Sequence, residues 1–149
     1  MSESSFQKPS AIERLFNRVF GLLVGLGLGL SHNYLLQVRG RKTGRLYSTP
    51  VNLLSVDGEK YLVAPRGEAQ WVRNARASGE VWLKKGFRRQ HFLVKELSAP
   101  ERPVLLKEYL ERYRKTVQRY FTVPVGSDQE AFQGISERHP VFRLQSEKP

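Results

Sequence analysis

The sequence is poor in the residues on which much enzyme chemistry depends. Its 149 residues include no cysteine, three histidines and two aspartates. The lack of cysteine excludes disulfides, thiolate zinc sites, cysteine-ligated iron–sulfur clusters and cysteine nucleophiles. It also fits a reducing cytoplasm, where we expect the protein to reside. The histidines His32, His91 and His139 have no metal-ligand spacing, so we predict no metal site.

Several familiar motifs are absent as well. GRKTG at 40–44 lacks the earlier glycine of a Walker loop, and a strand pattern follows it where a P-loop needs a helix. GLGLG at 25–29 has the wrong final spacing for a dinucleotide fingerprint and follows a predicted helix. The sequence contains no GxSxG elbow. These absences argue against P-loop nucleotide binding, dinucleotide-dependent chemistry and serine hydrolysis.

No apolar run is long enough to span a membrane. Residues 1–10 are polar and predict a flexible N-terminus. Ser10 and Glu13 form a capping box that begins an amphipathic helix, expected over 11–30. Its apolar end is the stretch 20–30, whereas a spanning helix needs about 20 residues. We expect this helix to pack on the core, with peripheral contact with a membrane surface as the alternative.

Positive charge is what the sequence has in excess. Against 14 Asp+Glu stand 25 Lys+Arg, a formal net charge of +11. Such a surface attracts an anion, which can be nucleic acid, a phosphorylated cofactor or an acidic membrane. The length and the 40% hydrophobic content favour one folded domain over 1–149.

Strand patterns dominate the middle of the chain, with an Asp57-Gly58 hairpin turn between two of them. We expect six strands, the second irregular at Pro50, at 34–39, 46–56, 60–64, 81–84, 90–96 and 141–144. Helices are expected at 70–77 and 100–121. Mostly antiparallel strands with flanking helices indicate an α+β fold, either a small barrel or a curled sheet.

The densest charge lies in RGRKTGR at 39–45, a predicted turn between two strands. Its glycines let the backbone approach a ligand, and successive amides can form an anion-binding nest. Arg41 and Arg45 can clamp a phosphate while Lys42 acts as a point charge. The alternative is a solvated basic hairpin tip.

A second feature is VAPRG at 63–67, followed by Trp71 and Asn74. A strand that ends in a kinked loop, with Trp and Asn about one helical turn apart, can wall a flat ring. We expect the amides of Arg66 and Gly67 to be free to bond a heterocycle. For Trp71 the alternative is an anchor in the core.

The order strand, GRKTG, strand, DG turn, YLVA-x-[KR]-G and W-x-x-N resembles the deazaflavin (coenzyme F-420)-dependent nitroreductase family. The resemblance covers roughly residues 12–144. It implies an antiparallel split β-barrel related to FMN-binding, pyridoxamine-phosphate-oxidase-like folds, with flanking helices.

The resemblance also implies two groups of cofactor-binding residues. The first group holds the phosphate and acidic tail of coenzyme F-420 and comprises Arg41, Lys42, Thr43, Gly44 and Arg45. The second group runs beside the deazaflavin ring and shapes its pocket, and it comprises Ala64, Pro65, Arg66, Gly67, Trp71 and Asn74.

The implied activity is hydride transfer from reduced F-420 to a quinone- or nitro-type acceptor. The cofactor carries the difficult chemistry, which accounts for the shortage of histidines and carboxylates. Tyr109, Tyr113 and Tyr120 fall within about 40° of one another at about 100° per helical residue, so they can form an acceptor wall. The alternative is a stripe that faces the core, and no catalytic residue is assigned.

Other classes stay open. An FMN- or haem-binding split barrel is one, with FMN as the alternative cofactor. A basic nucleic-acid-binding module is another, because Lys84, Lys85, Arg88 and Arg89 surround Phe87 in a pattern that suits single strands. The absence of any RNP signature argues against a nucleic-acid partner. A homodimer and a membrane-associated location are further alternatives.

Overall fold

The computed structural model describes residues 32–146. The predicted N-terminal segment 1–10 and helix 11–30 lie outside the described residues. Seven strands are present in the described part: β1 (Asn33–Arg39), β2 (Leu46–Asn52), β3 (Leu54–Val56), β4 (Glu59–Val63), β5 (Glu80–Lys85), β6 (Arg88–Glu96) and β7 (Val141–Ser146). The helices are α2 (Gln70–Ser78), η1 (Ala99–Glu101), α3 (Pro103–Val117), η2 (Gln118–Tyr120), α4 (Gln129–Gln133) and η3 (Ser136–Arg138).

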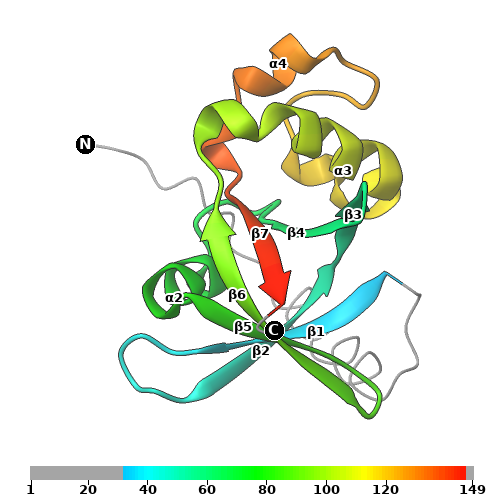
Figure 1. Cartoon of the computed structure of the whole chain (residues 1–149). Coiled ribbons are helices and arrows are strands. Elements are labelled where there is room, and N and C mark those ends of the chain that lie inside the picture. The colour runs from blue at the N-terminus through cyan, green and yellow to red at the C-terminus, as the bar shows by residue number, and fades with distance from the viewer. Residues whose placement is uncertain (1–31, 147–149) are drawn as a thin grey trace.

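The strands form one antiparallel sheet in the order β2-β1-β5-β6-β7-β4-β3. The two edge strands, β2 and β3, are consecutive in sequence and are separated by Leu53 alone. Because a single residue joins the two edges, the sheet has to curl until they meet, which gives the half-closed barrel seen in Figure 1. The amide of Leu53 donates to the carbonyl of His32 at 2.8 Å and fixes this corner.

One predicted strand, 46–56, is therefore two strands. The break falls at Leu53 and not at Pro50, which pairs with Leu35 inside β2. Proline is tolerated there because β2 is an edge strand, where a missing amide donor costs no ladder bond on the open side. The turn at Asp57 and Gly58 is confirmed, and both residues have positive φ, 51° and 81°, as a type I′ hairpin requires.

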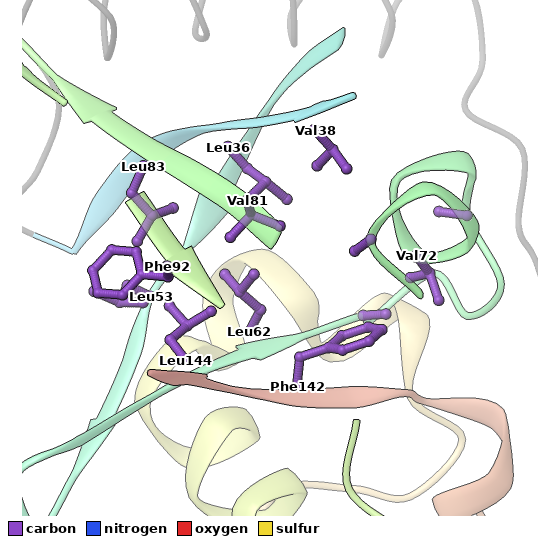
Figure 2. Packing of buried hydrophobic residues seen from close by; sticks show 13 residues of the cluster. Leu36, Val38, Leu53, Leu62, Val72, Val81, Leu83, Phe92, Phe142 and Leu144 are labelled. Carbon is purple, nitrogen blue, oxygen red and sulfur yellow. The ribbon is translucent and has the colours of Figure 1, made fainter. Parts of the chain in front are cut away.

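The core is divided between the two faces of the curled sheet. Inside the curl, alternate strand residues pack with Val72 of α2, among them Leu36, Val81, Leu83 and Phe142 (Figure 2). A second cluster lies beneath α3 and α4 and includes Leu54, Leu106, Leu110, Phe132 and Val141. α2 and α3 thus cover different parts of the sheet, and the space between them is left for a site.

The two predicted helices are present with changed ends. α2 extends one residue beyond the predicted 70–77 to Ser78 and is capped by Gly79, which has φ of 77°. The predicted helix 100–121 is interrupted: η1 precedes α3, Tyr113 has non-helical φ and ψ of −120° and 27°, and η2 follows. No helix in the described range 32–146 has the length and apolar character that crossing a membrane demands.

Candidate active site

A cavity of about 1130 Å³ lies between the sheet and the helices. Its lining comes mainly from four segments: residues 40–43, strand β2, the loop after β4 with α2, and residues 115–120. The curl of the sheet brings these distant segments together (Figure 1). Ten of the predicted site residues line it: Arg41, Lys42, Thr43, Ala64, Pro65, Arg66, Trp71, Asn74, Tyr109 and Tyr120.

The lining is positively charged. Six cations come from three of the four segments: Arg41, Lys42, Arg66, Arg73, Lys115 and Arg119. The described lining residues include no aspartate or glutamate. A concave wall with charge of one sign concentrates the electrostatic potential inside it. The cavity is therefore suited to an acidic ligand.

Arg41 is held in place by α2. Its backbone N–H donates to Asn74 Oδ1 at 3.0 Å, and its guanidinium donates to the same oxygen at 2.8 Å and to Gln70 Oε1 at 3.1 Å. Asn74 is buried, so its amide oxygen depends on these bonds for its hydrogen-bond partners. Asn74 was predicted as a pocket wall; it lines the cavity and is also a positioning residue for Arg41.

Most amides in the turn 39–45 are already in use. Gly40 N–H donates to the carbonyl of Arg45, Gly44 N–H to that of Gly40, and Arg45 N–H to Thr43 Oγ1. The Arg41 amide is bound to Asn74. Within the turn 39–45, the amides of Lys42 and Thr43 therefore remain available to bind an anion. The predicted nest is thus smaller than the sequence suggested.

The predicted clamp between Arg41 and Arg45 does not form across the cavity. Gly44, with φ of 76°, reverses the chain into β2, and neither Gly44 nor Arg45 belongs to the cavity lining. Arg39 bonds back to the carbonyl of Gly44 at 3.1 Å and lies 5.5 Å from the ring centroid of Trp82. Of the four cations in this turn, Arg41 and Lys42 alone line the cavity.

The loop after β4 forms another wall through Val63, Ala64, Pro65 and Arg66. The prediction that the Gly67 amide is free was wrong, because it donates to the carbonyl of Ala64 at 3.1 Å. Gly67 has φ of 88° and closes this tight turn without itself lining the cavity. Its contribution is the shape of the loop.

His139 supports the same loop from behind. Its ring is buried, stacks on Phe121 at 4.3 Å between centroids, and places Nδ1 3.2 Å from the carbonyl oxygen of Ala64. Burial lowers the pKa of His139 to about 4, so the ring is neutral at neutral pH. Because a carbonyl only accepts, Nδ1 carries the hydrogen in this bond.

The three predicted tyrosines have different positions. Tyr109 and Tyr120 line the cavity, whereas Tyr113 does not and instead donates its hydroxyl to the carbonyl of Leu53 at 2.6 Å. The prediction assumed one continuous helix, and the non-helical backbone at Tyr113 breaks that regular spacing. The Tyr120 hydroxyl accepts from the Arg66 guanidinium at 2.6 Å, which joins the loop wall to η2.

Neutral polar groups lie at the far end of the cavity, where β1 begins and β2 ends. Asn33 Nδ2 donates to Asn52 Oδ1 at 2.7 Å, and the hydroxyl of Tyr109 is hydrogen-bonded to the Asn52 side chain. Burial raises the pKa of Tyr109, so its hydroxyl remains protonated at neutral pH. This end can therefore donate hydrogen bonds without carrying charge.

Sequence reasoning missed one complete wall and several cations. The missed wall residues belong to β2: Tyr47, Ser48, Thr49, Pro50, Val51 and Asn52. A signal existed, because a strand with Ser, Thr, Pro and Asn is too polar for a core strand. Gln70, Arg73, Lys115, Thr116 and Arg119 were also missed, and the last three reach the cavity after the irregular backbone at Tyr113, which has no clear sequence signature.

A profile of the F420H(2)-dependent quinone reductase family matches residues 13–128. The chain belongs to this family. Membership confirms the family resemblance, the oxidoreductase class and the dependence on coenzyme F-420 that the sequence predicted. It does not by itself decide which acceptor this quinone reductase family member reduces.

Solved structures place this family member among split barrels. An F420-H2 dependent reductase has a TM-score of 0.52 and 20% identity, with 77% of this chain and 95% of that chain covered. A structure described as a domain-swapped dimer has a TM-score of 0.54 and 20% identity, with 90% of this chain and 93% of that chain covered. A putative pyridoxamine 5'-phosphate oxidase from Listeria innocua has a TM-score of 0.50 and 15% identity, with 85% of this chain and 91% of that chain covered. These similarities confirm the predicted fold. Comparison with the curated proteins gives no match.

The residues present fit the cofactor of the family. F-420 combines a flat deazaflavin ring with a phosphate and an acidic tail, and the cavity combines half-buried Trp71 with six cations. Six consecutive residues of strand β2 line the cavity, a length of about 20 Å, so the space is elongated as such a molecule requires.

Proposed function

We propose that this protein is a reductase that uses F420H2 to reduce a quinone-type acceptor inside the 1130 Å³ cavity. The observation that supports it most is the division of the cavity along β2. Two of the six cations, Arg41 and Lys42, lie with two available amides at the end formed by residues 40–43, and the neutral group of Asn33, Asn52 and Tyr109 lies where β1 begins and β2 ends. An acidic cofactor and a neutral acceptor are suited to these two ends.

Arg41 and Lys42, with the amides of Lys42 and Thr43, would hold the phosphate and acidic tail. Arg41 is already oriented by Asn74 and Gln70, so little side-chain freedom is lost when it binds an anion. Trp71 and the loop 63–66 would lie against the ring. Reduced F-420, when bound, supplies a hydride, and the protein contributes orientation and the exclusion of water.

The acceptor end offers Tyr109 as a hydrogen-bond donor. Its raised pKa keeps the hydroxyl protonated, and Asn52 fixes its position, so it can donate to a carbonyl oxygen on which negative charge develops. Pro50, Val51 and Val117 provide apolar surface in the same cavity. A quinone, which is flat and apolar with two carbonyl oxygens, matches these groups. A nitro compound presents comparable oxygens and is the second candidate.

Titration of the full chain with F-420, FMN and haem, followed by fluorescence or absorbance, tests the cofactor assignment. We expect saturable binding of F-420 and weaker or no binding of FMN and haem. The acceptor is then tested by mixing the F420H2 complex with a water-soluble quinone or a nitroaromatic compound and measuring kcat/KM for each. Faster turnover of the nitroaromatic compound, or tighter binding of FMN than of F-420, would contradict the proposal.

The homodimer expected as an alternative stays a prediction. It is supported by the fold shared with the structure described as a domain-swapped dimer, at 20% identity. Light scattering of the full chain in solution measures the mass directly, and a monomer mass of 17.2 kDa would rule the homodimer out under those conditions.

A further inference from the structure

The β5–β6 tip, residues 84–89, has no role in the cavity. Its sequence is KKGFRR, and none of these residues lines the cavity. Gly86 has φ of 62° and is the first of two turn residues, as a type II′ hairpin requires, and Phe87 is the second. This turn places Phe87 at the apex of the hairpin.

Phe87 is the most exposed large apolar residue in the described range. Its side chain is fully solvent-accessible, with a relative exposure of 108%, whereas the next, Val104, has 54%. β7 pairs with β6 from Phe92 onward, so Arg88 to His91 have β5 as their neighbour and the hairpin projects from the sheet (Figure 1). A single exposed apolar side chain is ordinary on a protein surface, so Phe87 points to a contact only together with the cations beside it.

The cations of the tip are arranged as like-charge pairs. Lys84 lies directly opposite Arg89, and Lys85 directly opposite Arg88, which is unfavourable in an isolated hairpin. In the described chain neither Lys84, Arg88 nor Arg89 forms an ion pair with a carboxylate. Lys85 lies over the ring of Tyr34, with Nζ 4.9 Å from the centroid, and Arg89 lies over Trp82 at 4.8 Å. Lys84 and Arg88 are therefore the tip cations that an anionic surface would contact.

We propose that the β5–β6 tip docks on an anionic phospholipid bilayer, with Phe87 in the interfacial region and Lys84 and Arg88 against the headgroups. One apolar wedge flanked by cations matches the two contributions that hold proteins at a membrane surface, apolar burial and attraction to anionic lipid. The long cationic side chains reach past the ring to the headgroups while Phe87 enters.

The surface is less suited to single-stranded nucleic acid. Such binding needs aromatic faces on which successive bases stack. The nearby sheet aromatic, Trp82, is already covered by the guanidinium groups of Arg39 and Arg89, 5.5 and 4.8 Å from its ring centroid. Arg89 is further fixed by donating to Gln37 Oε1 at 2.8 Å. Phe87 is therefore a single aromatic side chain at the tip, which suits insertion into a bilayer better than the stacking of successive bases.

The absence of cysteine makes a direct test possible. A Phe87→Cys variant of the full chain carries one thiol, which can be labelled with an environment-sensitive fluorophore, and Val104→Cys provides the matched control on α3. With vesicles that contain phosphatidylserine, we expect a blue-shifted, brighter emission at position 87 and no change at position 104. Vesicles of phosphatidylcholine alone should give little or no shift.

Sedimentation with the same vesicles measures the energetic role of the tip. Phe87→Ser should lower the partition coefficient about tenfold, and Arg88→Gln about fivefold. The controls Val104→Ser and Arg114→Gln, which replace one exposed apolar and one cationic side chain on α3, should have little effect. A circular dichroism spectrum and a urea unfolding midpoint like those of the wild-type chain show that each variant is folded.

Three results would overturn the proposal. The first is no binding to phosphatidylserine vesicles. The second is binding that Phe87→Ser and Arg88→Gln leave unchanged, which would assign it to another part of the chain. The third is binding of a single-stranded oligonucleotide that both variants weaken while vesicles do not bind, which would assign the tip to nucleic acid. The vesicle experiments need neither cofactor nor acceptor, so their outcome is independent of the proposed function.

Discussion

The turn 39–45 and the β5–β6 tip have nearly the same composition and different surroundings. Each contains four cations and glycine within a hairpin connection. The first is docked on α2 through Arg41, Asn74 and Gln70 and lines a cavity. The second projects from the sheet with Phe87 at its apex. The comparison indicates that placement, and not charge density, separates the two hairpins: buried Asn74 holds Arg41 inside a cavity, whereas the tip presents its cations on an exposed apex.

Replacing Arg41 should have the largest effect of the changes considered. Arg41→Ala removes a charge-assisted contact with the cofactor phosphate, and we expect F-420 to bind about 10- to 100-fold more weakly. Arg45→Ala in the same turn and Arg88→Ala in the β5–β6 tip are the matched controls, with changes below about threefold. Fluorescence titration measures all three. Equal losses in the three variants would show that binding depends on net charge alone.

Variants at Asn74 test whether the position of Arg41, in addition to its charge, contributes to F-420 binding. Asn74→Ala removes the acceptor of two Arg41 bonds, and we expect a loss of about 1–3 kcal/mol in the free energy of unfolding together with weaker F-420 binding. Asn74→Asp keeps the acceptor but adds negative charge to the cavity, so stability should be largely retained while F-420 affinity falls. Urea unfolding and titration give the two quantities. Unaltered affinity in both variants would contradict the positioning role.

His139 gives a pH dependence to stability. Its pKa is about 4 in the folded protein, below the ordinary value of 6.5, so between these values the unfolded chain binds more protons and stability falls as pH decreases. Between pH 7 and pH 5 this group should remove about 2 kcal/mol from the free energy of unfolding. The loss should be absent in His139→Gln. Urea unfolding at both pH values checks it, and an equal pH response in the two proteins would show that His139 is not the source.

The smallest effect is expected when residues of the β5–β6 tip are changed and the activity of the cavity is measured. Lys85→Ala and Phe87→Ser should leave kcat/KM with a water-soluble quinone within about twofold and the free energy of unfolding within about 0.5 kcal/mol. A tenfold fall in kcat/KM for either variant would mean that the tip communicates with the cavity, and the contrast between the two basic hairpins would fail.

The sequence was sufficient for the features that depend on local patterns. Alternating apolar residues predicted most strands, Asp57-Gly58 predicted its turn, and GRKTG with Trp71 and Asn74 identified the family. The corner at Leu53 was not predictable in this way, because it depends on the curl that brings β2 and β3 to opposite edges of one sheet.

The site was predicted less completely for the same reason. Arg45 and Gly67 lie in the right motifs, but the direction of Arg45 and the internal bond of the Gly67 amide follow from the turns at Gly44 and Gly67. Tyr113 still contacts Tyr109, with ring centroids 5.2 Å apart, but its hydroxyl bonds to the carbonyl of Leu53 and it does not line the cavity. These features depend on the tertiary structure. A sequence motif predicts which segment lies near a ligand more reliably than it predicts which atoms of that segment contact the ligand.

The most direct test of the central claim is the F-420 titration of the wild-type chain beside Arg41→Ala, Arg45→Ala and Arg88→Ala at one low salt concentration. The account predicts saturable binding that Arg41→Ala weakens about 10- to 100-fold and the other two leave nearly unchanged. The contradicting result is absent binding to the wild-type chain, or equal weakening by all three variants.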